Sequence, residues 1–186
     1  AVNSSFHRIT VDGDTSTNDA CAIFATGEAG NQIIEKRDAP EAEAFSQCLQ
    51  LLATDLARAV VRDAEGATKF VTIMVEEGKS EDECLDVAFT VAHSPLVKTA
   101  IFACDPNWGR ILAAVGRSDL SSLDINSISL MINNLVIFEH GAIAQIYDEE
   151  TVSEAMRSPN IDIRIKLGSG LESCQVWTSD LSYDYV

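Results

Sequence analysis

A long helical pattern between Pro40 and Asp63 is the feature that most constrains how this chain folds. Apolar residues recur there at intervals of three and four, which places them on one face of a helix. That face comprises Phe45, Cys48, Leu49, Leu52, Leu56, Ala59 and Val60. Pro40 suits the first turn of such a helix, and Gly66 follows as a stop. We therefore expect a helix of about six turns whose apolar face is buried.

A strand with one dry and one wet face is predicted near the end of the chain. Four apolar residues, Ile161, Ile163, Ile165 and Leu167, alternate there with Asp162, Arg164 and Lys166. Side chains alternate between the two faces of a sheet, so this pattern fits a half-buried strand. The Gly168-Ser169-Gly170 turn that follows predicts a partner strand from Glu172 to Thr178.

Shorter patterns predict the remaining elements. Strands are expected at Ile9–Val11, Ala20–Ala25, Phe70–Val75, Thr99–Ala103, Ile128–Ile132 and Leu135–Phe138, the last two joined by the turn Asn133-Asn134. One helix begins with a capping box at Ser80 and ends before Pro95. Another begins with Asp105 as N-cap and Pro106 in its first position, and a short helix follows Asp148.

Interleaved strands and helices without a strict repeat predict a mixed α/β (α+β) fold. No low-complexity linker divides the chain. If two subdomains exist, the join near Lys69 is the expected boundary, which gives residues 1–68 and 69–186; a single domain is the alternative.

Composition excludes several classes of partner. The 186 residues carry 13 Lys and Arg against 29 Asp and Glu, a formal charge of 13 − 29 = −16. Such an acidic chain repels phosphate backbones and anionic lipid, so we expect no nucleic-acid partner. No apolar run approaches the length of a bilayer, so we expect no membrane association. The five widely spaced cysteines indicate reduced thiols in a cytoplasmic protein rather than disulfides or a zinc site.

The most unusual polar segment is DGDTSTND, from Asp12 to Asp19, between two expected strands. Its simplest interpretation is a hydrogen-bonded turn built by Asx and Ser/Thr side chains. A calcium loop is excluded because Thr17 and Ile23 occupy the positions of the required Gly and Glu. A DxDxT-type phosphatase loop with Asp12 as nucleophile is a near miss at Ser16, and it stays open as an alternative.

Two further segments place charges at the ends of expected elements. Glu65 follows the long helix, where a carboxylate can bind a substrate ammonium, although composition alone favours a solvated helix end. Lys98 and Arg110 flank an expected strand-to-helix turn, and a free helix N-terminus there would form an anion site. The chain closes with TSDLSYDYV, which is rich in hydroxyls and aromatics.

Taken together, four segments resemble the ornithine acetyltransferase family (glutamate N-acetyltransferase, the ArgJ family). They are SFHRITVDGDTSTND, RDAEGATKF, SPLVKTAIFACDPNWGR and TSDLSYDYV, in the order and spacing of the family from Ser5 to Val186. The resemblance implies the beta subunit of a self-processing precursor, with a layered α/β sandwich that an alpha chain completes. It also implies an α2β2 heterotetramer that acts in arginine biosynthesis in the cytoplasm.

The chemistry implied by the resemblance is acyl transfer through a threonine. The precursor cuts itself at an Ala-Thr bond, and the Thr freed at the start of beta is the nucleophile, with its own α-amino group as base. Its hydroxyl attacks the acetyl group of N-acetylornithine, the alpha chain supplies the oxyanion hole, and glutamate then takes the acetyl group. Some members also accept acetyl-CoA as donor. No metal and no organic cofactor is implied.

One site residue carries over by position. Glu65 matches the substrate-binding glutamate of the DGEGATK-type motif, where it holds a substrate ammonium or tunes the amine of the nucleophile. This chain has Ala64 where the family usually has Gly. The nucleophilic Thr is expected upstream of Ala1, and the family's last substrate-binding segment after SYDYV is also missing, so we expect the 186-residue chain alone to be inactive. An N-terminal-nucleophile aminopeptidase or amidase of similar fold is the other alternative.

Overall fold

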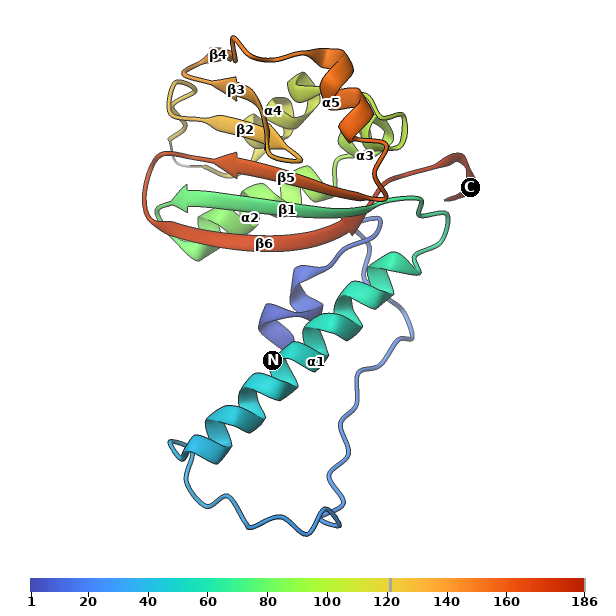
Figure 1. Cartoon of the computed structure of the whole chain (residues 1–186), viewed down its shortest axis with the longest axis vertical. Coiled ribbons are helices and arrows are strands. Elements are labelled where there is room, and N and C mark those ends of the chain that lie inside the picture. The colour runs from blue at the N-terminus through green and yellow to red at the C-terminus, as the bar shows by residue number, and fades with distance from the viewer. Residues whose placement is uncertain (121, 186) are drawn as a thin grey trace.

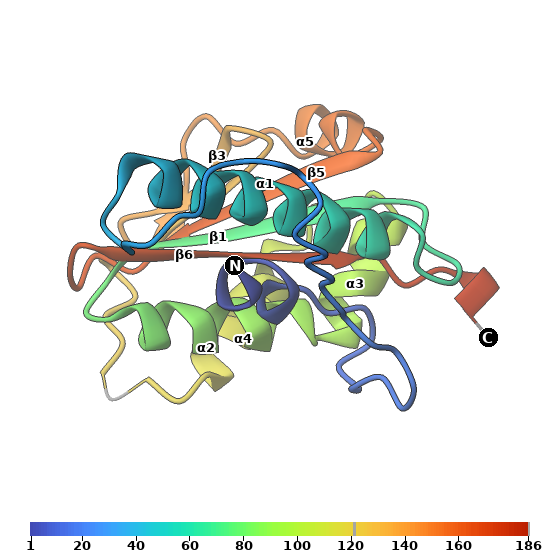
Figure 2. The same cartoon turned by 90° about the horizontal axis from the view of Figure 1, so that it is seen from below.

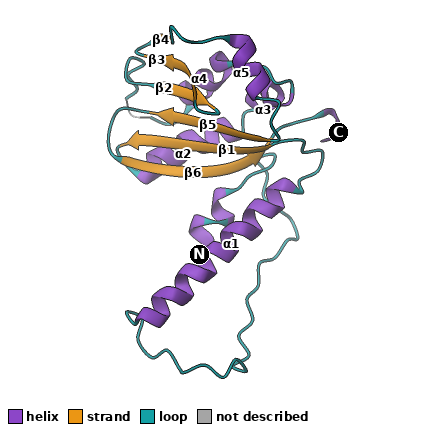
Figure 3. Cartoon of the chain, in the orientation of Figure 1, coloured by secondary structure: helices purple, strands orange, loops and turns teal. Residues whose placement is uncertain are grey.

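A computed structural model describes residues 1–120 and 122–185 and shows one mixed sheet with helices on both faces (Figure 1). The strands are β1 Phe70–Gly78, β2 Ser129–Ile132, β3 Leu135–Glu139, β4 Ala142–Ile143, β5 Asn160–Lys166 and β6 Glu172–Ser179. The α-helices are α1 Pro40–Arg62, α2 Glu81–Ala92, α3 Pro95–Phe102, α4 Trp108–Arg117 and α5 Glu149–Ala155. Three 3₁₀ turns, η1 Val2–Ser4, η2 Phe6–Arg8 and η3 Tyr183–Tyr185, lie near the ends of the chain (Figure 3). The predicted mixed α/β class is confirmed.

The six strands lie in the order β4-β3-β2-β5-β1-β6, with β1 and β5 parallel and every other pair antiparallel. The alternation predicted for β5 is confirmed, because Ile161, Ile163 and Ile165 are buried while Asp162 is exposed. The predicted pairing of β5 with β6 is wrong. β1 lies between them, and the connecting turn docks on the end of β1, where the backbone amides of Ser169 and Gly170 donate to the Glu77 carbonyl.

Helices α2 and α4 pack on one face of the sheet and α1 lies on the other (Figure 2). The helix predicted from Ser80 is confirmed as α2. Its N-cap hydroxyl accepts from the amide of Glu83 at 3.1 Å, as a capping box requires. The Glu83 carboxylate reaches one residue further back than expected, because it accepts from the amide of Lys79. Local hydrogen bonds thus fix where the helix over the core begins.

The burial predicted for α1 is wrong. Its large apolar side chains point to solvent: Phe45, Leu51, Leu52, Leu56 and Val60 are each more than half exposed. A neighbouring row of small residues, Ala53, Ala57 and Val61, is buried instead. α1 meets the sheet near its C-terminal end, where Val61 packs against Phe70 and Trp177. We call the exposed row Phe45, Leu52, Leu56 and Val60 the α1 apolar face; nothing in the described part of the chain covers it.

The segment Ala20–Ala25 is not a strand, and all of its residues are exposed. Phe24 is 88% exposed, so the run of apolar letters does not reflect burial within this chain. Of the strand predicted at Ile9–Val11, only a parallel bridge from Ile9 to Trp177 is present. Thr10 then donates its amide to the Trp177 carbonyl at 3.0 Å. Within the described residues, Ala20–Ala25 finds no strand with which to pair.

The strand predicted at Thr99–Ala103 is wrong because Ser94-Pro95 begins a helix rather than only ending one. Ser94 caps α3 by accepting from the amide of Val97, and Pro95 takes the first helical position. The next predicted N-cap is also displaced. Asn107, not Asp105, caps α4, and the helix begins at Trp108.

Several local predictions are confirmed. Asn133 and Asn134 form the β2–β3 turn, both with positive φ (47° and 65°), which asparagine tolerates well. Asp148 caps α5 by accepting from the amide of Thr151 at 2.8 Å. None of the helices in the described part of the chain is both long and apolar enough to span a bilayer. The subdomain boundary at Lys69 stays a prediction.

Candidate functional site

Segments far apart in the sequence meet around the turn that carries Glu65, between the end of α1 and the start of β1. The amide of Ala67 donates to the Ala64 carbonyl at 3.0 Å, which closes a β-turn. Gly66 has a φ of +66°, the conformation that a type II turn demands of its third residue. A Cβ on Gly66 would lie 2.6 Å from the backbone nitrogen of Tyr185. The C-terminal segment therefore packs directly on the turn, and only glycine fits there.

Ala64, the one residue that departs from the family motif, has a backbone conformation that alanine adopts without strain. Ala64 is not among the residues with positive φ, so its position does not require glycine. The exchange therefore leaves the geometry of the Glu65 turn intact.

Asp180 is the main tie between the C-terminal segment and the chain entering β1. Its Oδ1 accepts from the backbone amides of Thr68 at 2.8 Å and Lys69 at 2.9 Å. Its Oδ2 accepts from the hydroxyl of Thr68 at 2.5 Å. The side chain is buried, and a buried carboxylate needs such donors. Asp180 thus fixes the backbone just after the Glu65 turn.

Ser182 makes the second tie. Its hydroxyl donates to the Gly66 carbonyl at 2.5 Å and accepts from the amide of Asp184 at 3.1 Å. We call Asp180 and Ser182, with the turn they hold, the clasp. The sequence singled out TSDLSYDYV for its hydroxyls, but it did not reveal this pairing. The sequence signal for this contact is the position of Asp180 directly after β6, while the amides of Thr68 and Lys69 lie directly before the neighbouring strand β1.

Lys98 is buried on α3 and bonds to the end of β6, directly before Asp180 of the clasp. Its Nζ donates to the Thr178 hydroxyl at 2.9 Å and to the Ser179 carbonyl. Burial lowers the pKa of Lys98 to about 8, while the carboxylates of Asp180 and Asp12 act in the opposite direction. The Lys98 ammonium therefore bonds to the end of β6 and does not face solvent.

The anion site predicted between Lys98 and Arg110 is absent from the described residues. The Arg110 guanidinium donates to the Leu96 carbonyl at 2.8 Å, which ties α4 to α3. Its backbone amide donates to the side chain of Asn107, so the N-terminus of α4 is already capped. Both cations are occupied by structural contacts.

The Asp12–Asp19 loop is a self-bonded turn, as its simplest interpretation holds. Asp12 accepts from the amide of Asp14 at 2.8 Å, and Ser16 accepts from the amide of Asp19 at 2.9 Å. The loop also reaches the C-terminal segment, because the Tyr185 hydroxyl donates to Asp12 at 2.8 Å. These bonds, the Asp14 amide first, lower the pKa of Asp12. The loop is thereby attached to the residue that packs on Gly66.

The side chain of Glu65 is exposed and makes no hydrogen bond or ion pair with any described residue. The pKa of Tyr185 is raised, first by its hydrogen bond to Asp12, then by burial, and then by the carboxylates of Asp12, Asp14 and Glu65. Glu65 thus shares the surroundings of Tyr185 with two other carboxylates, and an unpaired carboxylate in such an acidic cluster suits a cationic group such as an ammonium. The role of Glu65 in substrate binding stays a prediction.

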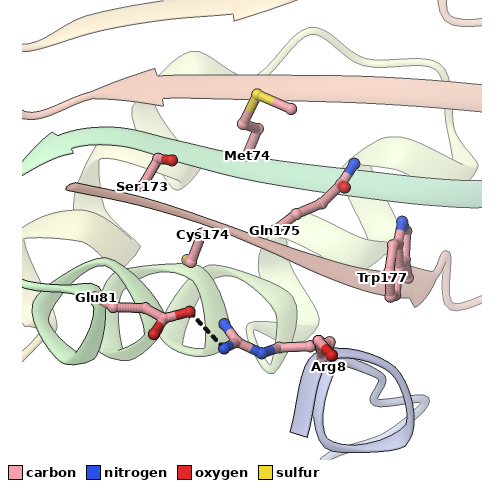
Figure 4. A pocket seen from close by; sticks show the side chains of 8 residues that line it. Arg8, Met74, Glu81, Ser173, Cys174, Gln175 and Trp177 are labelled. Carbon is pink, nitrogen blue, oxygen red and sulfur yellow. Dashed lines mark hydrogen bonds and ion pairs between the residues drawn. The ribbon is translucent and has the colours of Figure 1, made fainter. Parts of the chain in front are cut away.

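A hollow of about 340 Å³ lies elsewhere, between η2, α2 and β6 (Figure 4). The ion pair of Arg8 with Glu81, at 2.6 Å, is part of its lining. Trp177 also lines the hollow, and its indole N–H is buried without a partner among the described residues. Glu65 does not line this hollow. Val186, the last residue of the fourth family-like segment, lies outside the described residues.

The fold and the clasp define a mixed α/β protein with an acidic, hydrogen-bonded cluster at one end of its sheet, assembled from segments far apart in the sequence. Sequence comparison identifies the family within this class. The sequence model of the ArgJ family matches residues 1–186, and the chain belongs to that family.

Curated relatives and a solved structure agree with this assignment. The arginine biosynthesis bifunctional protein ArgJ of Methylococcus capsulatus is 52% identical over 186 residues, which is 100% of this chain and 45% of that protein. The protein of the same name from Pseudomonas fluorescens is 50% identical over 184 residues, 99% of this chain and 45% of that protein. A crystal structure of ArgJ from Bacillus halodurans matches with a TM-score of 0.92 and 36% identity, over 100% of this chain and 86% of that chain. The chain spans slightly less than half the length of these curated relatives.

Proposed function

We propose that this chain is part of the beta subunit of an acetyltransferase that moves the acetyl group of N-acetylornithine to glutamate in arginine biosynthesis. One observation carries the proposal. All four family-like segments contribute to the support of the exposed Glu65 turn: Asp12 through Tyr185, Thr68 through Asp180, and Lys98 through Thr178. The printed names of the relatives, which refer to arginine biosynthesis, are consistent with it.

The proposed reaction is a double displacement at a threonine that precedes Ala1 in the complete protein. The threonine oxygen forms a bond to the acetyl carbon, and its proton passes to the threonine's own α-amino group. The tetrahedral intermediate collapses with cleavage of the acetyl C–N bond, and ornithine leaves with that proton. The amine of glutamate then attacks the acyl-threonine, the C–O bond breaks, and the threonine regains its proton.

Glu65 is the residue of this chain that we assign to substrate binding. Its carboxylate has no partner among the described residues and shares the surroundings of Tyr185 with the carboxylates of Asp12 and Asp14. The side-chain ammonium of N-acetylornithine is the complementary group. A charge-assisted hydrogen bond between the two would stabilise the bound substrate by about 1.5–3 kcal/mol.

The nucleophile would reach Glu65 along α1. The Ser4 hydroxyl donates to Gln50 at 2.7 Å, so the Ala1 end lies beside the middle of this helix. Twelve residues separate Gln50 from Arg62, which corresponds to about 18 Å of helix. About six residues of extended chain cover that distance. A threonine upstream of Ala1 is therefore within reach of the turn.

The proposed partner is the alpha chain of the same precursor, in a cytoplasmic α2β2 heterotetramer formed after self-cleavage. The α1 apolar face supports a partner, because a row of large exposed apolar residues is typical of an interaction surface. The word "bifunctional" in the relatives' names agrees with a second donor, acetyl-CoA, for the synthesis of N-acetylglutamate.

Neither alternative gains support from the site. The relatives described above are named for arginine biosynthesis and not for peptide or amide hydrolysis. Both carboxylate oxygens of Asp12 already accept hydrogen bonds, from Asp14 and from Tyr185, which does not suit a phosphatase nucleophile.

Kinetics of Glu65→Gln in the complete protein test the proposal. We expect kcat/KM for N-acetylornithine to fall by about 10- to 150-fold, with the loss mainly in KM. Asp63→Asn is the matched control, since it removes an exposed carboxylate two residues before Glu65, just outside the turn, and should change kcat/KM less than about threefold. Unchanged kinetics for Glu65→Gln, or equal losses for both variants, would remove Glu65 from the site. A complete wild-type protein without acetyl transfer would refute the function itself.

A further inference from the structure

Lys98 joins α3 to the C-terminal segment at more than one point. Its ammonium donates to Thr178 and Ser179, and its own carbonyl accepts from the amide of Leu181 at 3.4 Å. The segment from Thr178 to Ser182 is therefore held against α3 along its length. Only 3% of Lys98 is exposed, so solvent cannot replace these contacts.

The same segment holds the Glu65 turn from its other side. Asp180 binds the amides just after the turn, and Ser182 binds the Gly66 carbonyl within it. The carboxylate of Glu65 has no polar contact of its own among the described residues. Its position is therefore set by the backbone of the turn, which the clasp fixes.

Stability alone does not account for a lysine at this place. Burial lowers the pKa of Lys98 to about 8, so the folded protein disfavours its charged form. A well-packed apolar side chain of similar length would avoid that cost, as replacements of buried charges have shown in other proteins. Residues that reduce stability are expected where function requires a particular geometry.

We propose that Lys98 is a positioning residue for substrate binding: it anchors the Thr178–Ser182 segment to α3 and thereby holds the Glu65 turn in its binding geometry. The inference rests on the proposed acetyl transfer, because that reaction supplies the role of Glu65. Lys98 touches neither substrate nor nucleophile in this account. It acts entirely through the clasp.

A double-mutant cycle in the complete protein tests this role. Lys98→Met should lower kcat/KM for N-acetylornithine by about 10²-fold, the loss that a misplacement of about 1 Å produces, with most of the change in KM. In a Glu65→Gln background the same substitution should cost less than about threefold, because both changes remove one interaction. Equal fold-losses in the two backgrounds, or no loss in the wild-type background, would overturn the proposal.

Arg110→Met is the matched control. Arg110 is another cation that ties α3 to a neighbouring element, but its guanidinium donates to the Leu96 carbonyl at 2.8 Å rather than to the C-terminal segment. Arg110→Met should lower the melting temperature slightly and leave KM unchanged. Lys98→Met should raise KM at neutral pH, with the melting temperature little changed. A raised KM in Arg110→Met, to the same extent as in Lys98→Met, would show a general effect of loosening α3 and contradict the inference.

Two further measurements distinguish a failure of this inference from a failure of the proposed function. If Lys98→Met does not fold, Ser182→Ala replaces it in the same cycle, since it removes only the two hydrogen bonds that the Ser182 hydroxyl makes in the clasp. Hydrogen exchange needs no activity: the amides of Thr68 and Lys69 should exchange faster in Lys98→Met and at the wild-type rate in Arg110→Met. Unchanged exchange in Lys98→Met would refute the positioning role even if the protein transfers acetyl groups. Faster exchange in a protein without acetyl transfer would refute only the function.

Discussion

Replacement of Asp180 gives the sharpest test of the clasp as a physical device. Asp180→Ala removes the acceptor for two backbone amides. The amide of Lys69 is buried and cannot donate a hydrogen bond to water instead, whereas the amide of Thr68 is partly accessible to solvent. An unsatisfied buried donor costs about 1–3 kcal/mol, so we expect the free energy of unfolding to fall by about 2–4 kcal/mol. For a chain of this length that corresponds to a melting temperature lower by about 10 °C.

Asp180→Asn separates the acceptor from the charge. The amide oxygen of Asn takes the place of Oδ1 and still accepts from Thr68 and Lys69, so only about 1 kcal/mol of charge assistance is lost. Asp162→Ala, at an exposed aspartate of β5, should change stability by less than about 0.5 kcal/mol. Thermal and urea unfolding of the 186-residue chain measure all three variants. Equal losses for Asp180→Ala and Asp180→Asn would refute the reasoning, because the backbone amides would then not depend on that oxygen.

Three other predictions concern the turn, the buried lysine and the exposed helix face. Gly66→Ala should destabilise the chain by at least about 2 kcal/mol in urea unfolding, because alanine disfavours positive φ and its methyl would meet the backbone of Tyr185; a neutral effect would contradict the turn geometry. The pKa of Lys98 falls from 10.5 to about 8 on folding, so the unfolded chain binds more protons between these values and the free energy of unfolding rises with pH across this window. Lys98→Met should remove about 3 kcal/mol of that rise, and an unchanged pH profile would refute the shift. Leu56→Ser should leave the melting temperature of this chain nearly unchanged but weaken its co-purification with the rest of the complete protein, and wild-type assembly would exclude this face from the interface.

The sequence correctly predicted the features that depend on interactions between neighbouring residues. The alternating isoleucines of β5 lie on one buried face, and the capping residues Ser80 and Asp148 begin their helices as expected. Each of these signals depends on a few neighbouring residues. Ser94-Pro95 is also a local signal: the proline predicts the end of the preceding helix, and the structure shows that the pair also begins α3.

The failures have a non-local cause. The apolar residues of α1 predicted a buried face, but the helix buries its small residues, Ala53 and Ala57, and leaves Leu52 and Leu56 outside. Periodicity shows which side of a helix is apolar; it does not show whether that side meets another part of the same chain. The connection after β5 failed for a similar reason, because a strand from much earlier in the chain, β1, lies between β5 and β6.

The candidate site was only partly readable from the sequence. The resemblance placed Glu65, and the structure places it on an exposed turn with no polar partner among the described residues. It did not reveal that Asp180 and Lys98, on other segments, fix the backbone of that turn. Such contacts join residues about one hundred positions apart, and no spacing rule links them.

The most direct test is a structure of the complete protein with N-acetylornithine bound. We expect the side-chain ammonium of the ligand to lie about 3 Å from the Glu65 carboxylate, with the acetyl group facing a threonine that precedes Ala1. A ligand bound elsewhere, or a Glu65 carboxylate that still points into solvent in that complex, would contradict it.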